Sequence, residues 1–85
     1  GWNTLDVVKP NSLLEGISDN DFFFFVHSYY SNPVDRNIIV AETDYGLCFA
    51  SVVSYRNVWG TQFHPEKSGK PGKVVLHNFA EIIKK

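Results

Sequence analysis

Ten consecutive residues, DFFFFVHSYY at 21–30, constrain the fold more than any other stretch of this chain. An amphipathic strand alternates apolar and polar side chains, whereas positions 22–26 are aromatic or β-branched without a break. A continuous run of this kind is typical of a central β-strand that is covered on both faces. The pleat of such a strand separates two sets of side chains: Phe22, Phe24, Val26 and Ser28 on one face, and Phe23, Phe25, His27 and Tyr29 on the other.

The remaining segments predict further strands followed by one helix. Asn11 or Ser12 can cap a helical turn at 11–17 that ends at Gly16. We expect strands at 36–43, 47–55 and 58–64, joined by the short turns DYG and RN into antiparallel hairpins. A helix is expected at 71–85, where apolar residues recur at helical spacing: Val75, Phe79, Ile82 and Ile83. The sequence therefore predicts an α/β fold of mostly antiparallel strands with a closing C-terminal helix.

Length and charge exclude several classes of protein. Eighty-five residues make one small domain or part of a larger one, and the absence of any methionine favours a piece of a longer chain. The net charge is −1 with no run of Lys or Arg, so nucleic acid is not an expected partner. No apolar run reaches the length of a membrane span. A single cysteine forms no internal disulfide, which favours a reducing, cytoplasmic location.

The stretch GTQFHPEKSGKPG at 60–72 holds a candidate acid–base pair. His64 and Glu66 are two positions apart, and in an extended backbone such residues point to the same side, with Cα atoms roughly 6–7 Å apart. Pro65 restricts both its own φ and the backbone of His64. A carboxylate held against one ring nitrogen selects the imidazole tautomer, and the other nitrogen can then accept a proton. The alternative is a surface histidine beside a proline that ends a strand.

The other candidate residues have simpler explanations. Cys48 lies between Leu47 and Phe49 without a glycine elbow, so we interpret it as a small buried apolar residue. His27 is interpreted as a hydrogen-bonded core residue, and His77 as a solvent-exposed residue of the helix. His27, His64 and Glu66 could together form a two-histidine, one-carboxylate metal site, but no tighter motif supports it, and we predict neither metal nor cofactor.

Three motifs resemble those of the class I (triad) glutamine amidotransferases. GTQFHPEKS is similar to the C-terminal catalytic signature of that family, and FVHSYY to the strand that ends beside its glutamine pocket. GWN at positions 1–3, with Lys67 and Ser68 directly after the glutamate, resembles one branch. That branch is the glutaminase subunit of imidazole glycerol phosphate synthase, in histidine biosynthesis. The resemblance runs over essentially the whole chain, in order and with compatible spacing.

The resemblance implies a Cys-His-Glu triad in which His64 is the general base and acid and Glu66 orients it. The main chain at Ser28 and Tyr29 would hold the carboxylate of the substrate glutamine. The resemblance also implies that ammonia passes through a tunnel to a barrel-shaped cyclase subunit, and three residues are expected near that interface: Trp2, Asn3 and Lys67.

The nucleophile elbow of the family, a G-x-C-x-G motif, has no match here, and Cys48 does not fall at its position. We therefore predict residues 1–85 to be the C-terminal portion of a single amidotransferase domain, inactive alone because the nucleophilic cysteine is missing. Two alternatives stay open. One is another class I amidotransferase with a different acceptor, and the other is a non-catalytic glutamine-binding or scaffold fragment.

Overall fold

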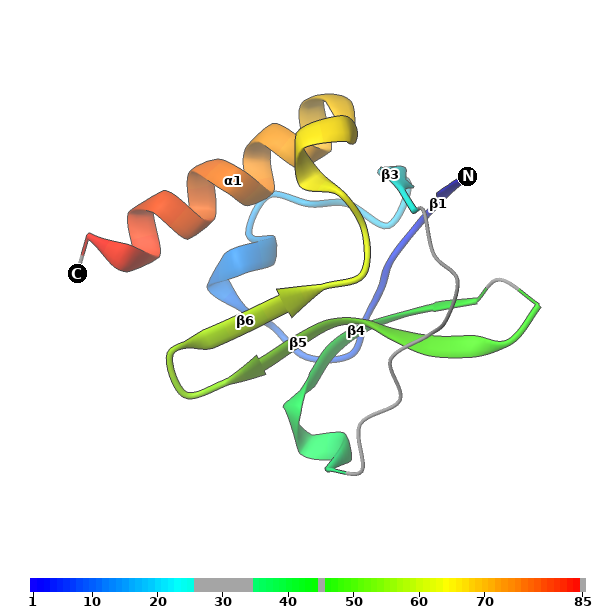
Figure 1. Ribbon diagram of the computed structural model, residues 1–85, viewed down its shortest axis with the longest axis horizontal. Helices are drawn as coiled ribbons and strands as arrows, with labels where there is room; N and C mark the ends of the chain where they lie inside the picture. The colour runs from blue at the N-terminus through cyan, green and yellow to red at the C-terminus, as the bar shows by residue number, and fades with distance from the viewer. Residues whose placement is uncertain (26–34, 45, 85) are drawn as a thin grey trace.

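The computed structural model describes residues 1–25, 35–44 and 46–84 of the chain. Figure 1 shows a twisted antiparallel sheet with the C-terminal helix lying along one side of it. The elements in chain order are β1 (Trp2–Asn3), β2 (Asp6–Val7), the 3₁₀ turn η1 (Ser12–Leu14), β3 (Phe23–Phe24), the 3₁₀ turn η2 (Arg36–Ile38), β4 (Ile39–Asp44), β5 (Cys48–Tyr55), β6 (Val58–Thr61), the 3₁₀ turn η3 (Pro65–Lys67) and α1 (Gly69–Ile83).

The larger sheet has four strands in the order β2-β4-β5-β6, and each neighbouring pair is antiparallel. Gly46, with φ of +82°, lies in the turn between β4 and β5, and Arg56, with φ of 57°, lies in the turn between β5 and β6. Glycine adopts such a φ at little cost, which explains its place in the first turn. The predicted fold class and both hairpins are therefore confirmed.

Strand β3 differs from the expected ten-residue central strand. It spans only Phe23–Phe24 and pairs with β1, while an isolated antiparallel bridge joins Phe25 to Phe63 on its other side. Phe23 and Phe25 are buried, whereas Phe22 is 53% exposed. In the described part of the chain, the face of Phe23 and Phe25 is therefore covered, and Phe22 on the other face is exposed. Cover on both faces stays a prediction for the parent protein. Positions 26–30 of that prediction lie outside the described residues.

Helix α1 closes the fold against the first part of the chain. The helix is present as predicted, and Pro71 lies in its first turn as expected. Its apolar stripe is only partly buried, because Val75 is 2% exposed in the core whereas Phe79 and Ile83 are 40% and 64% exposed. The Asn78 amide donates two hydrogen bonds to main-chain oxygens around η1, at 2.9 Å to Leu13 and 2.8 Å to Glu15. The side chain of Asn11 caps η1 by accepting from the amide of Leu13. The helix and the N-terminal turn therefore hold each other in place.

The core lies between α1, the sheet and β3. It is built from aromatic and aliphatic side chains, and the Phe25 ring contacts those of Phe49 and Phe63, each at 5.8 Å between centroids. The members of this cluster are Leu5, Leu13, Leu14, Phe23, Phe25, Val40, Ala41, Phe49, Val52, Phe63 and Val75. In the described part of the chain, no helix combines the length and apolar character that crossing a membrane requires.

Candidate active site

His64 and Glu66 meet at the turn between the sheet and α1. The ring Nδ1 of His64 lies 3.2 Å from Oε2 of Glu66, and the two side chains are 41% and 59% exposed. The contact matches the sequence expectation, and the backbone of His64 is extended as expected, with φ of −100° and ψ of 99°. The backbone after His64 differs from the expectation. Strand β6 ends at Thr61 and Pro65 begins the 3₁₀ turn η3, so a tight turn rather than an extended strand brings the two side chains together. In the described part of the chain, Nε2 of His64 has no hydrogen-bond partner and can take a proton.

The surroundings of Glu66 favour its ionised form. Hydrogen bonding by its own backbone lowers the pKa of the Glu66 carboxyl, and partial desolvation opposes this effect. The hydrogen bond and charge of His64, together with the charge of Lys67, lower the pKa further. A carboxylate that is ionised at neutral pH can accept a hydrogen bond from the N–H at Nδ1 of His64. This arrangement favours the tautomer whose free nitrogen is Nε2.

The main chain of His64 is fixed between β3 and η3. Its N–H donates to the carbonyl oxygen of Phe24 at 2.9 Å, and its own carbonyl oxygen accepts from the amide of Lys67 at 3.0 Å. That oxygen also accepts from the hydroxyl of Ser68 at 2.6 Å. Sequence reasoning missed Phe24 because it lies forty positions from His64, which no local pattern indicates. It missed the role of Ser68, four positions from His64, because the Ser68 hydroxyl also accepts from the distant amide of Phe24.

The residues assigned to a partner interface lie on two sides of β3. Trp2 and Asn3 form β1, and the ring of Trp2, 53% exposed, lies 5.4 Å from the ring of Phe24. Asn3 donates from its side-chain amide to the main-chain oxygen of Asp44. Lys67 is exposed at the end of η3. Because Phe24 contacts both Trp2 and the main chain of His64, the structure connects this surface to the acid–base pair.

Cys48 differs from the sequence expectation. It was interpreted as a buried residue, but it is exposed, because it is the first residue of β5 beside the hairpin turn. The pKa of its thiol is raised, through local desolvation and through the carboxylates of Glu42, Asp44 and Asp6. A raised pKa lowers the fraction of reactive thiolate, so Cys48 remains unsuited to act as the nucleophile.

Other predicted site residues lie outside the described part of the structure. Ser28, Tyr29 and His27 belong to this group, so the metal set that combined His27 with His64 and Glu66 is not described as a whole. Within residues 1–25, 35–44 and 46–84, no cluster of three or more His, Cys, Asp or Glu side chains is placed to hold a metal ion. His77 is exposed on α1, as expected.

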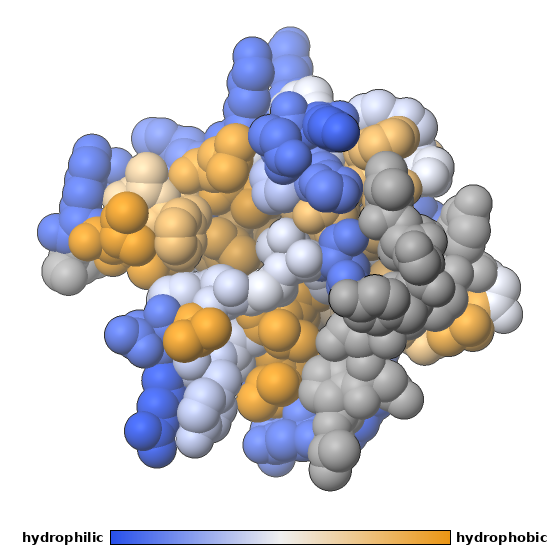
Figure 2. Space-filling view, viewed as in Figure 1, coloured by the Kyte–Doolittle hydropathy of each residue, from blue (hydrophilic) through white to orange (hydrophobic). Residues whose placement is uncertain are grey.

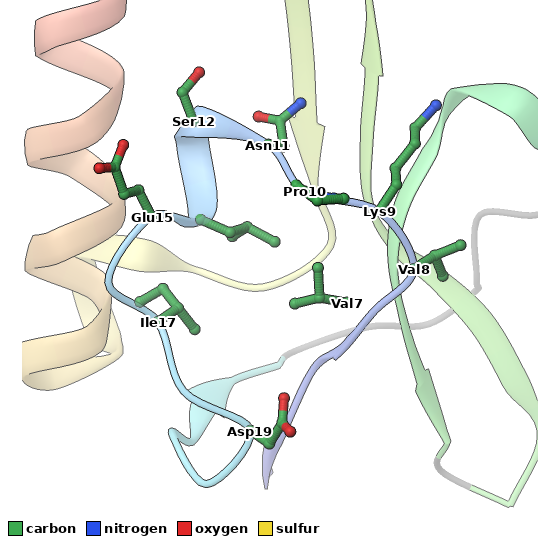
Figure 3. Close-up of a pocket in the computed structure, with 10 residues that line it drawn as sticks. Val7, Val8, Lys9, Pro10, Asn11, Ser12, Glu15, Ile17 and Asp19 are labelled. Carbon is green, nitrogen blue, oxygen red and sulfur yellow. The ribbon is translucent and has the colours of Figure 1, made fainter.

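A hollow of about 710 Å³ opens elsewhere on the molecule, between the end of β2 and η1. Figure 3 shows Val7, Val8 and Ile17 around it, together with polar groups of Asn11, Glu15 and other residues. Of the predicted site residues that the structure describes, none lines this hollow. The acid–base pair is therefore a feature of the η3 turn and not of this hollow.

Comparisons with known proteins match the chain over nearly its whole length. The family described as glutamine amidotransferase class-I matches residues 1–83. The chain is 52% identical over 83 residues to the HisH subunit of imidazole glycerol phosphate synthase from Methanocaldococcus jannaschii, covering 98% of this chain and 42% of the relative. For the same subunit of Methanothermobacter thermautotrophicus the identity is 50% over 84 residues, which cover 99% of this chain and 41% of the relative. For subunit HisH 1 of Methanococcus maripaludis the identity is 48% over 83 residues, which cover 98% of this chain and 41% of the relative. The chain thus spans about two fifths of the length of these relatives.

Proposed function

The chain belongs to the glutamine amidotransferase class-I family, and from this membership we propose that it is the C-terminal portion, residues 1–85, of a glutaminase subunit of imidazole glycerol phosphate synthase. The contact between Nδ1 of His64 and Oε2 of Glu66, at 3.2 Å, is the observation that supports this role most directly. The proposed reaction is hydrolysis of glutamine to glutamate and ammonia.

In the proposed mechanism, Nε2 of His64 takes the proton from a cysteine thiol that lies upstream of this chain. The thiolate attacks the amide carbon of glutamine, and a tetrahedral intermediate forms. His64 then returns the proton to the leaving nitrogen, so that ammonia departs and a thioester remains. Water, deprotonated by His64, attacks the thioester and releases glutamate. Glu66 stabilises the imidazolium that forms in both halves of the reaction.

The ammonia is proposed to pass to a synthase partner, because the similar proteins are named as subunits of a synthase. We assign Trp2, Asn3 and Lys67 to the surface that contacts this partner, a barrel-shaped cyclase in the proposal. The exposed ring of Trp2 supports the assignment, since large aromatic side chains are enriched in interfaces. The main chain at Ser28 and Tyr29 is proposed to hold the glutamine carboxylate, and the enzyme is proposed to act in the cytoplasm.

A single substitution in the full-length parent protein tests the function. His64→Ala removes the general base, and we expect kcat for glutamine hydrolysis to fall by about 10⁴-fold, as for other triad members. The matched control is His77→Ala, since His77 is an exposed histidine of the same chain on α1. Full turnover in the His64→Ala protein, measured as glutamate release, would contradict the proposal.

One observation favours a second candidate, a non-catalytic glutamine-binding module. In the part of the chain that the structure describes, the free thiol is Cys48, whose raised pKa makes it a poor nucleophile. Calorimetry of the 85-residue chain with glutamine separates the candidates. Heat of binding without release of ammonia supports the module for this chain, while activity of the parent protein supports the glutaminase.

A further inference from the structure

The hydroxyl of Ser68 closes a ring of hydrogen bonds with two main-chain residues. Ser68 is 1% exposed, and its Oγ accepts from the N–H of Phe24 at 2.9 Å. The same Oγ donates to the carbonyl oxygen of His64 at 2.6 Å. The N–H of His64 donates in turn to the carbonyl oxygen of Phe24 at 2.9 Å. One hydroxyl thus joins β3 to the turn that carries the acid–base pair.

The position of Ser68 makes this use of its side chain unusual. Ser68 is the N-cap residue of α1, where a serine oxygen commonly accepts from an amide of the first helical turn. Its side chain makes no such capping bond. Its donor and acceptor are instead both used toward His64 and Phe24, the latter 44 positions away. Helix α1 therefore lacks a capping hydrogen bond from Ser68, and the turn at His64 is joined to Phe24 through the same hydroxyl.

The ring fixes the backbone from which the His64 side chain extends. The N–H of His64 is bonded to β3, and its carbonyl oxygen is bonded to Ser68 and to the amide of Lys67. Because these main-chain groups are bonded, the imidazole ring of His64 moves mainly by rotation about its side-chain torsions. Because Ser68 is buried, water has little access to replace its hydroxyl if that group is removed. Loss of the hydroxyl would therefore loosen the turn.

We propose that Ser68 is a positioning residue for glutamine hydrolysis, whose hydroxyl fixes the main chain of His64 and so keeps the imidazole against Glu66. The inference rests on the proposed function of the parent protein. It assigns Ser68 no contact with substrate. It predicts that the rate of the chemical step depends on a buried hydroxyl that contacts the main chain of His64 and Phe24.

The test compares three variants of the full-length parent protein. Ser68→Ala removes the hydroxyl, and Ser68→Cys keeps a side chain of similar size that is a weak donor and acceptor. Ser51→Ala is the matched control, because Ser51 is equally buried at 1% exposure and its hydroxyl has no hydrogen-bond partner in the described structure. Each variant is assayed for kcat and kcat/KM of glutamine hydrolysis and for thermal stability, both alone and combined with Glu66→Gln.

We expect Ser68→Ala and Ser68→Cys each to lower kcat by about tenfold or more, since small displacements of a catalytic group are costly. Ser51→Ala should keep the parental kcat. The loss should also be smaller when Glu66 is already replaced by Gln, because the hydroxyl acts through the contact between His64 and Glu66. Partial unfolding would instead lower the rate by the same factor with and without the Glu66→Gln change. If Ser68→Ala does not fold, the comparison rests on Ser68→Cys.

Three results would overturn the proposal. The first is a parental kcat in Ser68→Ala, and the second is a parental kcat in Ser68→Cys, which would assign the role to side-chain volume. The third is a loss of rate by the same factor with and without Glu66→Gln, which would make Ser68 a purely structural residue. The His64→Ala variant distinguishes these results from failure of the proposed function. If His64→Ala loses activity while Ser68→Ala keeps full activity, the proposed function stands and only the positioning role of Ser68 is rejected.

Discussion

At the scale of single residues, the contact between His64 and Glu66 is open to solvent. Both side chains are partly exposed, so water competes with their hydrogen bond, and an isolated pair of this kind contributes little to stability. The role of this contact in the proposed mechanism is to select the imidazole tautomer of His64. A change at Glu66 should therefore affect catalysis much more than folding.

Glu66→Gln in the parent protein tests whether Glu66 affects catalysis more than folding. The glutamine amide can donate to Nδ1 of His64, which favours the tautomer with hydrogen on Nε2, and that tautomer cannot accept the thiol proton. We expect kcat to fall by about 10²-fold or more with little change in melting temperature. Glu81→Gln, an exposed carboxylate on α1, is the matched control. Equal kcat in the two variants would contradict an orienting role for Glu66.

The lowered pKa of Glu66 also predicts the pH dependence of its small effect on stability. A carboxyl whose pKa is lowered on folding stabilises the folded state above its unfolded pKa. That contribution is lost as pH falls through the folded-state value, which lies below the ordinary 4.5. Any difference in melting temperature between the parent and Glu66→Gln should therefore be present at neutral pH and vanish on acidification. A difference that grows on acidification would contradict the assigned direction.

At the scale of elements, α1 packs on η3 at a distance that only a glycine permits. A Cβ added to Gly72 would lie 1.9 Å from the carbonyl oxygen of Pro65 and 2.9 Å from the Cβ of Ser68. Neither neighbour is the far end of a flexible side chain, so one of the two elements must shift to admit a methyl group. Gly72 therefore sets how closely the helix approaches the turn that carries His64.

Gly72→Ala should destabilise the parent protein although alanine favours helix more than glycine does. We expect overpacking to lower the free energy of unfolding by about 1–3 kcal/mol, measured by urea denaturation. Gly46→Ala is the control, because the added Cβ meets nothing within 4 Å and only the positive φ of 82° is strained. A smaller loss for Gly72→Ala than for Gly46→Ala would contradict the close approach.

The sequence predicted those elements whose pattern is local. The hairpins of β4, β5 and β6 were predicted from the turns at Gly46 and Arg56, and α1 from its apolar spacing. The 3₁₀ turn at Pro65 and the exposure of Cys48 were missed because both lie at strand ends, where pattern reading is least precise. The approach of Gly72 to Pro65 was equally hidden, since a glycine near a helix start has several local explanations.

At the scale of the whole molecule, apolar side chains remain on the surface. Figure 2 shows some of them as orange groups over the region of α1. Leu76, Phe79 and Ile83 are 46%, 40% and 64% exposed on that helix, and Trp2 and Phe22 are each 53% exposed near β3. Exposed apolar surface of this kind marks sites of contact with other protein. We infer that further parts of the parent protein or its partner cover it.

The 85-residue chain alone should therefore self-associate or fold poorly. We expect its sedimentation coefficient to rise with concentration, and Phe22→Lys to weaken that rise by adding a charge beside β3. Leu47→Lys is the control, because Leu47 is 51% exposed in the hairpin turn between β4 and β5. A monomer with one cooperative thermal transition would contradict this prediction.

The two hydrogen bonds from Asn78 to the oxygens of Leu13 and Glu15 have a consequence for synthesis on the ribosome. Translation delivers η1 well before Asn78, so the N-terminal turn emerges many residues before its partner exists. Native contacts between distant positions form late because their loop must close first. The packing of α1 on the N-terminal turn is therefore expected to form later than the local turn that joins His64 to Glu66.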